Sequence, residues 1–218
     1  MTLSHNGSFL ATMLAQLTQV NRTHTLIQRV NSYSVSEFVC LLDFITAEFQ
    51  QFLRAIELIN NEALEAMLER ILEAITLKIG QILQADRTTI FLVDQEKGQL
   101  WSKNSSEDSE KLTEIRLPLN SGIAGHVATK GEYLNIPDAY NHPLFNADFD
   151  KQTGYHTRNI LCMPIFSSKN QVVAVVQLSN KVGNLPFDSD DVEQFQDFAA
   201  KIGIILESCR CFYVAARN

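Results

Sequence analysis

Small residues at an expected helix start give this sequence its most suggestive chemistry. The run Asn120-Ser121-Gly122-Ile123-Ala124-Gly125 follows a β-type segment and opens a short helix that we expect to end near Thr129. The first amides of a helix have no acceptor within it and lie at the positive end of its dipole, so the position suits one phosphate group. Glycine also lets a ligand approach the backbone closely. Most glycine-bounded helix starts bind nothing, so a second feature is needed.

That second feature is the segment 137–159, PDAYNHPLFNADFDKQTGYHTRN, which we call the lid. It has neither a helical nor a strand period, and structureless segments of this length inside a compact domain are usually lids or binding loops. Its aromatic and apolar side chains favour burial against something: Tyr140, Leu144, Phe145, Phe149 and Tyr155. One interpretation is an Ω-type loop that covers a sheet edge. The other is a cover over a small-molecule pocket beside the phosphate position.

The sequence offers no catalytic constellation. It contains no GxSxG, HExxH or GxxxxGK[ST] motif, and we assign no catalytic residue. The five histidines are scattered, which argues against a metal site. The four cysteines, Cys40, Cys162, Cys209 and Cys211, lack zinc spacing and the density of a disulfide scaffold; reduced thiols are favoured over a redox switch.

Composition narrows the class of protein. The 218 residues carry 18 basic and 25 acidic side chains, a net charge of −7, and 45% of them are hydrophobic. An acidic chain repels nucleic acid, and no apolar run reaches the ~20 residues that span a bilayer. The first residues, MTLSHNGSFLATMLAQL, lack a basic n-region, so we do not expect them to be a signal peptide. We expect a folded, cytoplasmic protein that binds neither nucleic acid nor membrane.

The hydrophobic period defines the elements that must position these residues. Residues 1–33 read as an N-terminal extension or linker. Ser34 and Glu37 form a capping-box pattern, and apolar residues at three- and four-residue steps then predict an amphipathic helix to about Ile59. A second helix is expected from Glu62 to Leu83.

After Ala85 the period changes from 3.6 to about two residues, which predicts strands. Expected strands cover 88–93, 100–102, 112–117, 133–136, 160–166 and 172–179, and a last helix begins at Asp188 or Ser189. Helices do not alternate with every strand, so a doubly wound parallel sheet fits poorly. We expect an α+β fold, with a six-stranded, largely antiparallel sheet and helices packed on one face.

Residues about 62–213 resemble a GAF domain of the kind that binds cyclic nucleotides in phosphodiesterases and bacterial adenylyl cyclases. The stretches that carry the resemblance are SGIAGHVATKGEYLNIPDAYNHPLF, TGYHTRNILCMPI and NKVGNLPFDSDDVE. The family fold, GAF/PAS-like, is a six-stranded antiparallel sheet flanked by helices. The resemblance thus implies an N-terminal extension at 1–33, an amphipathic signalling helix at 34–60, a GAF domain at 61–213 and a tail at 214–218.

The resemblance also implies a binding site. The cyclic phosphate would lie on the amides of Ile123 and Ala124. Arg87 and Thr89 match an Arg-x-Thr pattern of adenine-selective members, in which a strand-edge backbone group meets the N6 amine. The remaining expected ligand contacts are Asn146, Asp150, Thr153 and Thr157 in the lid, and Gln177 on the sheet.

This sequence departs from the family at several of these positions. Many relatives have Tyr at Asn146, and some have Glu at Gln177. Guanine-selective members place a Phe-Asp pair near Lys103-Asn104, and its absence here favours cAMP over cGMP. A structural clamp, the family's NK…F…DE signature, matches at Asn180, Lys181, Phe187 and Asp191, but Val192 replaces the final Glu.

We therefore expect a non-catalytic regulatory sensor whose ligand is cAMP, or cGMP, without a further cofactor. By resemblance, helices 36–59 and 189–213 would form a homodimer and carry occupancy to a cyclase or phosphodiesterase effector. The alternative is a structural dimerisation module with no bound nucleotide. A third reading, a thiol reductase acting in the same pocket, would depend on Cys162.

Overall fold

The computed structural model describes residues 28, 30–43, 45, 61–104 and 113–215. The chain divides into two compact units: Met1–Lys78 with Ser208–Asn218, and Ile79–Glu207. Most of the helix expected to run to Ile59, and nearly all of the extension at 1–33, lie outside the described residues. The domain boundaries drawn from the sequence stay predictions. All of the expected ligand residues belong to the second unit.

In the first unit, the helix over 35–43 begins at a capping box. The Ser34 amide donates to Glu37 Oε2 at 2.8 Å, and the Glu37 amide donates to Ser34 Oγ at 3.3 Å. These reciprocal bonds satisfy two amides that the helix itself leaves unpaired, as the sequence predicts. The bond from the Ser34 amide lowers the pKa of Glu37.

α4 (Asn61–Ile82) supplies a second anchor in this unit through Lys78. Lys78 is buried, and its Nζ donates to the carbonyl oxygens of Asn31, at 2.9 Å, and Tyr33. Burial lowers the Lys78 pKa. The lysine therefore fixes the chain that precedes the helix over 35–43.

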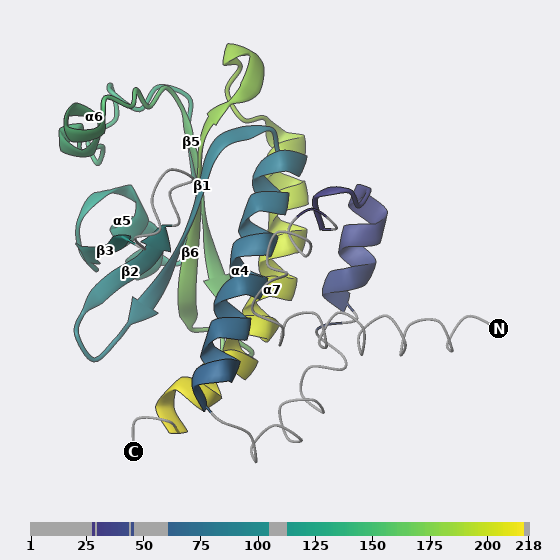
Figure 1. Cartoon of the computed structure of the whole chain (residues 1–218). Coiled ribbons are helices and arrows are strands. Elements are labelled where there is room, and N and C mark those ends of the chain that lie inside the picture. The colour runs from purple at the N-terminus through teal and green to yellow at the C-terminus, as the bar shows by residue number, and fades with distance from the viewer. Residues whose placement is uncertain (1–27, 29, 44, 46–60, 105–112, 216–218) are drawn as a thin grey trace. The chain divides into compact units, whose positions relative to one another are not determined.

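The second unit is built on six strands in the order β3-β2-β1-β6-β5-β4, and every neighbouring pair is antiparallel. The strands are β1 (Ala85–Asp94), β2 (Gln99–Asn104), β3 (Thr113–Pro118), β4 (Leu134–Ile136), β5 (Ile160–Phe166) and β6 (Val172–Lys181). Helices flank this sheet (Figure 1), which confirms the predicted fold class.

One face of the sheet packs against α5 (Gly122–Lys130), and we call it the α5 face. Ile123, Ala124 and Val127 of α5 share a buried apolar cluster with strand residues that include Phe91 and Val175. Because side chains alternate along a strand, every second residue of each strand belongs to this face.

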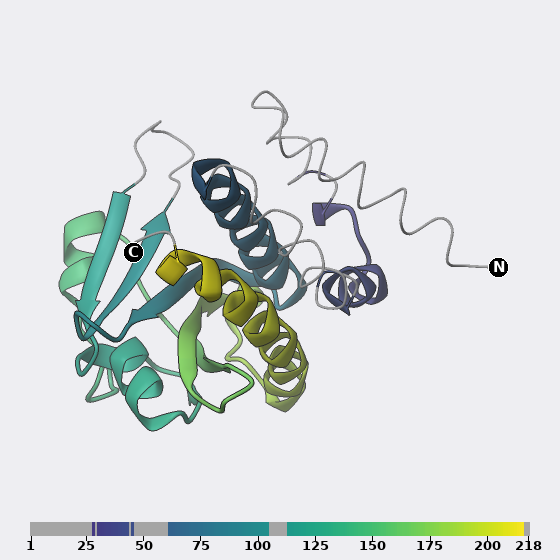
Figure 2. The ribbon, with the colours of Figure 1, turned by 90° about the horizontal axis from the view of Figure 1, so that it is seen from below.

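The opposite face packs against α7 (Ser189–Ala215), whose residues up to Glu207 belong to this unit (Figure 2). Phe195 and Phe198 are buried, and a Cβ on Gly203 would lie 2.0 Å from the Phe166 carbonyl oxygen. The expectation of helices on one face was therefore wrong, because α5 covers the other. Sequence period reveals which side of a helix is apolar but not which sheet face receives it.

The lid also differs from the sequence prediction. It contains a helix, α6 (Asp148–Thr153), which ends at Gly154 with a left-handed φ of 71°. Six residues are too few to display a helical period. Because it contains this helix, the lid is an ordered element.

Among the described residues, none of the helices is both long and apolar enough to cross a membrane.

Candidate functional site

The start of α5 presents amides that the helix does not pair. Gly122 has φ +69°, a left-handed conformation that favours glycine, and it turns the chain from β3 into the helix. The Ser121 side chain forms no capping hydrogen bond. The first-turn amides, which include those of Ile123 and Ala124, thus have no acceptor from their own helix.

Close packing fixes the position of this helix start. A Cβ on Gly125 would lie 2.8 Å from the Leu119 carbonyl oxygen, so only glycine permits the approach. Thr129 Oγ1 donates to the same oxygen at 3.0 Å. The amides of the first turn are therefore held in place by the turn that precedes them.

Three expected ligand residues share the α5 face. Thr89 pairs with Gln177 in the β1–β6 register, and Arg87 lies two residues before Thr89. The same alternation places Phe91 and Val175, from the α5 cluster, on this side. The structure therefore brings Arg87, Thr89 and Gln177 to the sheet face that also carries Ile123 and Ala124.

β1 and β2 are paired over only part of their length. All six residues of β2 pair with β3, but only Gln99, Leu100 and Trp101 pair with β1, opposite Leu92–Asp94. Within the described part of the chain, the β2-facing edge of β1 from Ala85 to Phe91 thus has no strand partner. A strand edge with free peptide groups can form hydrogen bonds with a planar ligand.

The lid reaches the same strand through aromatic side chains. The Arg87 guanidinium lies 3.9 Å from the Tyr155 ring centroid and 5.5 Å from that of Phe149. The Tyr155 hydroxyl donates to Asp86 Oδ2 at 2.8 Å. Sequence reasoning assigned no role to Tyr155 or Asp86. The only signal was the aromatic content of the lid, since 69 residues separate the two.

Inside the lid, Asp150 is the common hydrogen-bond acceptor. Its carboxylate accepts from the Thr157 amide at 2.6 Å, the Thr157 hydroxyl at 2.9 Å and the Tyr140 hydroxyl at 3.1 Å. Asp150 and Thr157 are only 5% and 6% exposed. These two expected ligand residues therefore bond to each other, and their visible role is to shape the lid.

The other two expected lid contacts, Asn146 and Thr153, lie at the ends of α6 and are exposed. Asn146 Oδ1 accepts from the Asp148 amide at 2.9 Å. Thr153 Oγ1 donates to the Phe149 carbonyl oxygen at 2.9 Å. Both side chains here make local hydrogen bonds that define where the short helix begins and ends.

The residues of the expected clamp connect β6 to α7 and to the lid. Lys181 Nζ forms ion pairs with Asp191 and, at 3.5 Å, with Asp188. Asn180 Oδ1 accepts from the Arg158 amide at 2.6 Å, and its Nδ2 donates to the His156 carbonyl oxygen at 2.8 Å. Asn180 thus holds the end of the lid, a role that the sequence did not indicate.

Burial and charge act in opposite directions at the clamp. Burial disfavours the charged form of Lys181, but the hydrogen bond and charge of Asp191 outweigh it, so the Lys181 pKa is raised. Phe187, also part of the expected clamp, is buried, and its carbonyl oxygen accepts from Asn135 Nδ2 at 2.9 Å.

Cys162 lies on the α5 face opposite Gln177 and is fully buried. Burial raises the pKa of its thiol, which keeps it protonated and poorly nucleophilic. Cys40 is exposed. The side chains of Cys209 and Cys211 lie outside the described part. Among the described residues, no group of three or more His, Cys, Asp or Glu side chains could hold a metal ion.

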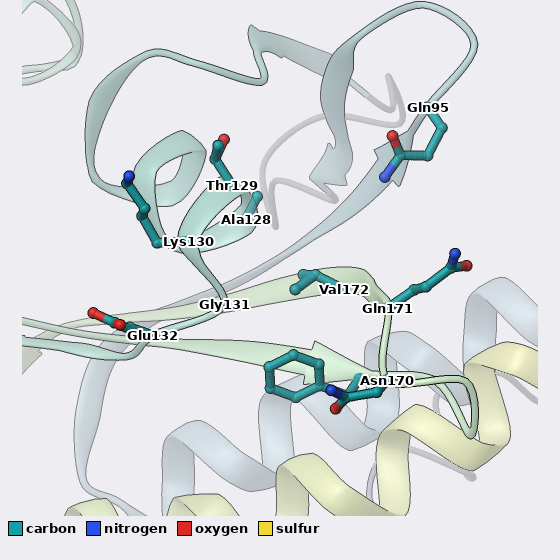
Figure 3. Close-up of a pocket in the computed structure, with 10 residues that line it drawn as sticks. Gln95, Ala128, Thr129, Lys130, Gly131, Glu132, Asn170, Gln171 and Val172 are labelled. Atoms are coloured by element: carbon teal, nitrogen blue, oxygen red, sulfur yellow. The ribbon is translucent and has the colours of Figure 1, made fainter.

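A separate pocket of about 820 Å³ lies at the C-terminal end of α5 (Figure 3). Polar side chains surround it, Gly131 and Val172 border it, and its lining is Gln95, Ala128, Thr129, Lys130, Gly131, Glu132, Phe166, Asn170, Gln171 and Val172. None of these is a predicted ligand residue. At 1.5 Å per residue, the nine residues of α5 place this pocket roughly 13 Å from the helix start.

Comparison with known families agrees with this architecture. The family model described as "GAF domain" matches residues 67–206, which include β1 to β6, the lid and most of α7. The chain belongs to the GAF domain family. GAF domains are generally regulatory sensor modules, and the match includes all the expected ligand residues.

One curated relative is the probable 3′,5′-cyclic phosphodiesterase pde-5 of Caenorhabditis elegans. It is 36% identical over 155 residues, which are 65% of this chain and 21% of that protein. The chain thus spans about a fifth of the length of this relative.

Solved structures of other GAF domains show the same fold. The GAF domain of a phosphoenolpyruvate-protein phosphotransferase from Coxiella burnetii has TM-score 0.57 and 18% identity, with 79% of this chain and 96% of that chain covered. The corresponding Acinetobacter domain has TM-score 0.54 and 15% identity, with 88% and 95% covered.

Proposed function

We propose that this GAF domain is a non-catalytic sensor that binds a 3′,5′-cyclic nucleotide between the α5 face and the lid, with cAMP preferred over cGMP. One observation carries the proposal. Arg87, Thr89 and Gln177 share the face that carries the α5 start, and the lid contacts Arg87 through Tyr155. The 36% sequence identity with a probable 3′,5′-cyclic phosphodiesterase supports a cyclic nucleotide as the ligand.

The cyclic phosphate would be bound by the amides of Ile123 and Ala124. A helix start carries about half a positive charge, and its free amides point toward an anion. The buried side chains of both residues fix the backbone there, so the amides need no rearrangement to receive the phosphate.

The base would lie along the open edge of β1. Peptide groups near Thr89 would meet the N6 amine of adenine, and the planar Arg87 guanidinium would flank the ring. Gln177 offers both an amide donor and an acceptor beside Thr89. Guanine lacks the N6 amine, which is the reason for preferring cAMP.

The lid would close over the ligand, with Asp150 and Thr157 setting its shape. Occupancy would then shift the flanking helices, in a homodimer through residues 36–59 and 189–213, and regulate a cyclase or phosphodiesterase effector. A ligand can shift such helices only by its differential affinity for the two arrangements. The match covers about a fifth of a longer phosphodiesterase, which supports the proposal that residues of this kind regulate an effector.

Calorimetric titration of the refolded, nucleotide-stripped chain with cAMP and then cGMP tests this function. We expect saturable binding of both, with cAMP tighter. Lys169→Ala, an exposed change outside the proposed site, should bind as the wild type does. A folded chain that binds neither nucleotide would contradict the proposal and favour a structural dimerisation module.

The proposed base contact has its own test. Arg87→Ala should reduce the ratio of cAMP to cGMP affinity by about tenfold, since a lost charged contact of ~1–2 kcal/mol corresponds to that change. Titrations of the variant with both nucleotides measure the ratio. An unchanged ratio would remove Arg87 from the selectivity argument.

A further inference from the structure

Tyr155 contacts two consecutive residues of β1 with two different parts of its side chain. The ring lies over the Arg87 guanidinium at 3.9 Å, and the hydroxyl donates to the Asp86 carboxylate at 2.8 Å. A cation thus meets the electron-rich ring face, and an anion meets the hydroxyl donor. The ring and the hydroxyl thus each make a favourable contact, and the two contacts together fix the position and orientation of the ring.

These contacts join the lid to β1, beside the hydrogen bonds by which Asn180 of β6 holds His156 and Arg158. Tyr155 lies directly after the αL residue that ends α6, and Asp150 ties α6 to Thr157. The polypeptide on both sides of Tyr155 is therefore already ordered within the lid. The ring therefore anchors the hydrogen-bonded segment from Asp150 to Thr157 to β1, in addition to the anchor that Asn180 provides on β6.

The same contacts constrain Arg87. A long arginine side chain on a strand would otherwise sample several rotamers, at an entropic cost to any ligand that must order it. The Tyr155 ring covers one side of the guanidinium, and Phe149 lies 5.5 Å away. Arg87 is thus preorganised before a ligand arrives.

We infer that Tyr155, with Asp86, is a positioning residue: it latches the lid onto β1 and orients Arg87 for the base. The part of this inference that concerns the ligand rests on the proposed function. The latch itself is a property of the unliganded chain. Tyr155 needs no contact with the nucleotide to act, since its effect passes through Arg87 and through the closed lid.

Hydrogen exchange on the unliganded full chain tests the latch without any nucleotide. Tyr155→Leu and Arg87→Ala should each speed exchange of the amides at 150–157 by about tenfold, and the double variant no more than the larger single effect. Tyr133→Leu, an exposed tyrosine before the lid, is the matched control and should leave these rates unchanged. Unaltered exchange in Tyr155→Leu, or effects that multiply in the double variant, would overturn the latch.

Binding kinetics test the link to the ligand. For cAMP, Tyr155→Leu should raise the dissociation rate about tenfold with the association rate nearly unchanged, and it should lower the cAMP/cGMP affinity ratio only when Arg87 is present. Tyr155→Phe keeps the ring and should retain the ratio, with a smaller rise in dissociation. Tighter binding by Tyr155→Leu would show that the ring competes with the base and would contradict the inference. Absence of nucleotide binding in the wild type would sink the proposed function, and the exchange measurement would still decide the latch.

Discussion

The sheet with α5 and α7, here called the framework, and the lid at 137–159 are held by different kinds of contact. The framework is held by apolar side chains from residues far apart in the sequence, such as Phe91, Val127 and Val175. In the lid, Ala139 is the one buried apolar residue, and Leu144 and Phe145 pack partly buried against the same apolar cluster. The other contacts of the lid are polar and involve Asp150, Asn180 of β6, and Tyr155.

This difference assigns the two regions different stabilities. Buried apolar area contributes to global unfolding, whereas a segment with few buried apolar side chains opens locally at lower free energy. A sensor needs both properties in one unit: a rigid surface that presents the phosphate site and a cover that can open to admit a ligand. The following changes should affect one region without the other.

The largest effect is expected from the framework. Phe195→Ala removes a fully buried ring of α7 and should lower the free energy of unfolding by about 3–5 kcal/mol. Chemical denaturation measures the loss. Gln196→Ala, the exposed neighbour on the same helix, should change stability by less than about 0.5 kcal/mol. A small loss for Phe195→Ala would mean that α7 contributes little to the core.

A smaller, local effect is expected from the lid. Asp150→Ala leaves the Thr157 amide and the Tyr140 hydroxyl without their acceptor, which costs about 1–3 kcal/mol of lid stability. Proteolysis after Lys151 and Arg158 should accelerate, and cAMP affinity should fall, while global unfolding changes much less than in Phe195→Ala. Asp148→Ala, an exposed acid in the same short helix, is the control. Equal effects of the two aspartate changes would refute the central role of Asp150.

The smallest effect concerns pH. Burial, with the hydrogen bond to Asp86, raises the pKa of Tyr155 above its ordinary value of about 10. The folded state then retains a proton that the unfolded state loses, so this contribution is complete below about pH 10 and declines as the pH rises further. Wild type should therefore lose stability relative to Tyr155→Phe between pH 10 and 11, as thermal melts can show. Parallel stability curves would argue against a half-buried hydroxyl that is hydrogen-bonded to Asp86.

Local patterns predicted the framework well. The change from a helical period to short runs of β-forming residues located the six strands; β5 and β6, which are buried on both faces, appear as nearly continuous apolar runs. The glycines at 122 and 125 located the start of α5, since one needs a left-handed turn and the other a close approach. The capping box at Ser34 and Glu37 is equally local, and the structure confirms it.

The features that the sequence did not predict depend on distant residues. Tyr155 meets Asp86 across 69 positions, and Asn180 binds the lid from β6 across more than twenty. The separation of β1 from β2 is a matter of register, which no single strand encodes. The short α6 forms because Asn146, Asp150 and Gly154 stabilise its ends, and its six residues are too few to show a hydrophobic period.

The most direct test of the proposed site is an NMR titration of the isotope-labelled, nucleotide-stripped chain with cAMP, which maps the residues whose amide chemical shifts change. We predict that the largest shift changes fall on Ile123 and Ala124 at the α5 start, with further changes at Thr89 and through the lid. Changes confined to Gly131 and to Asn170–Val172, around the pocket at the other end of α5, would place the ligand elsewhere and contradict the account.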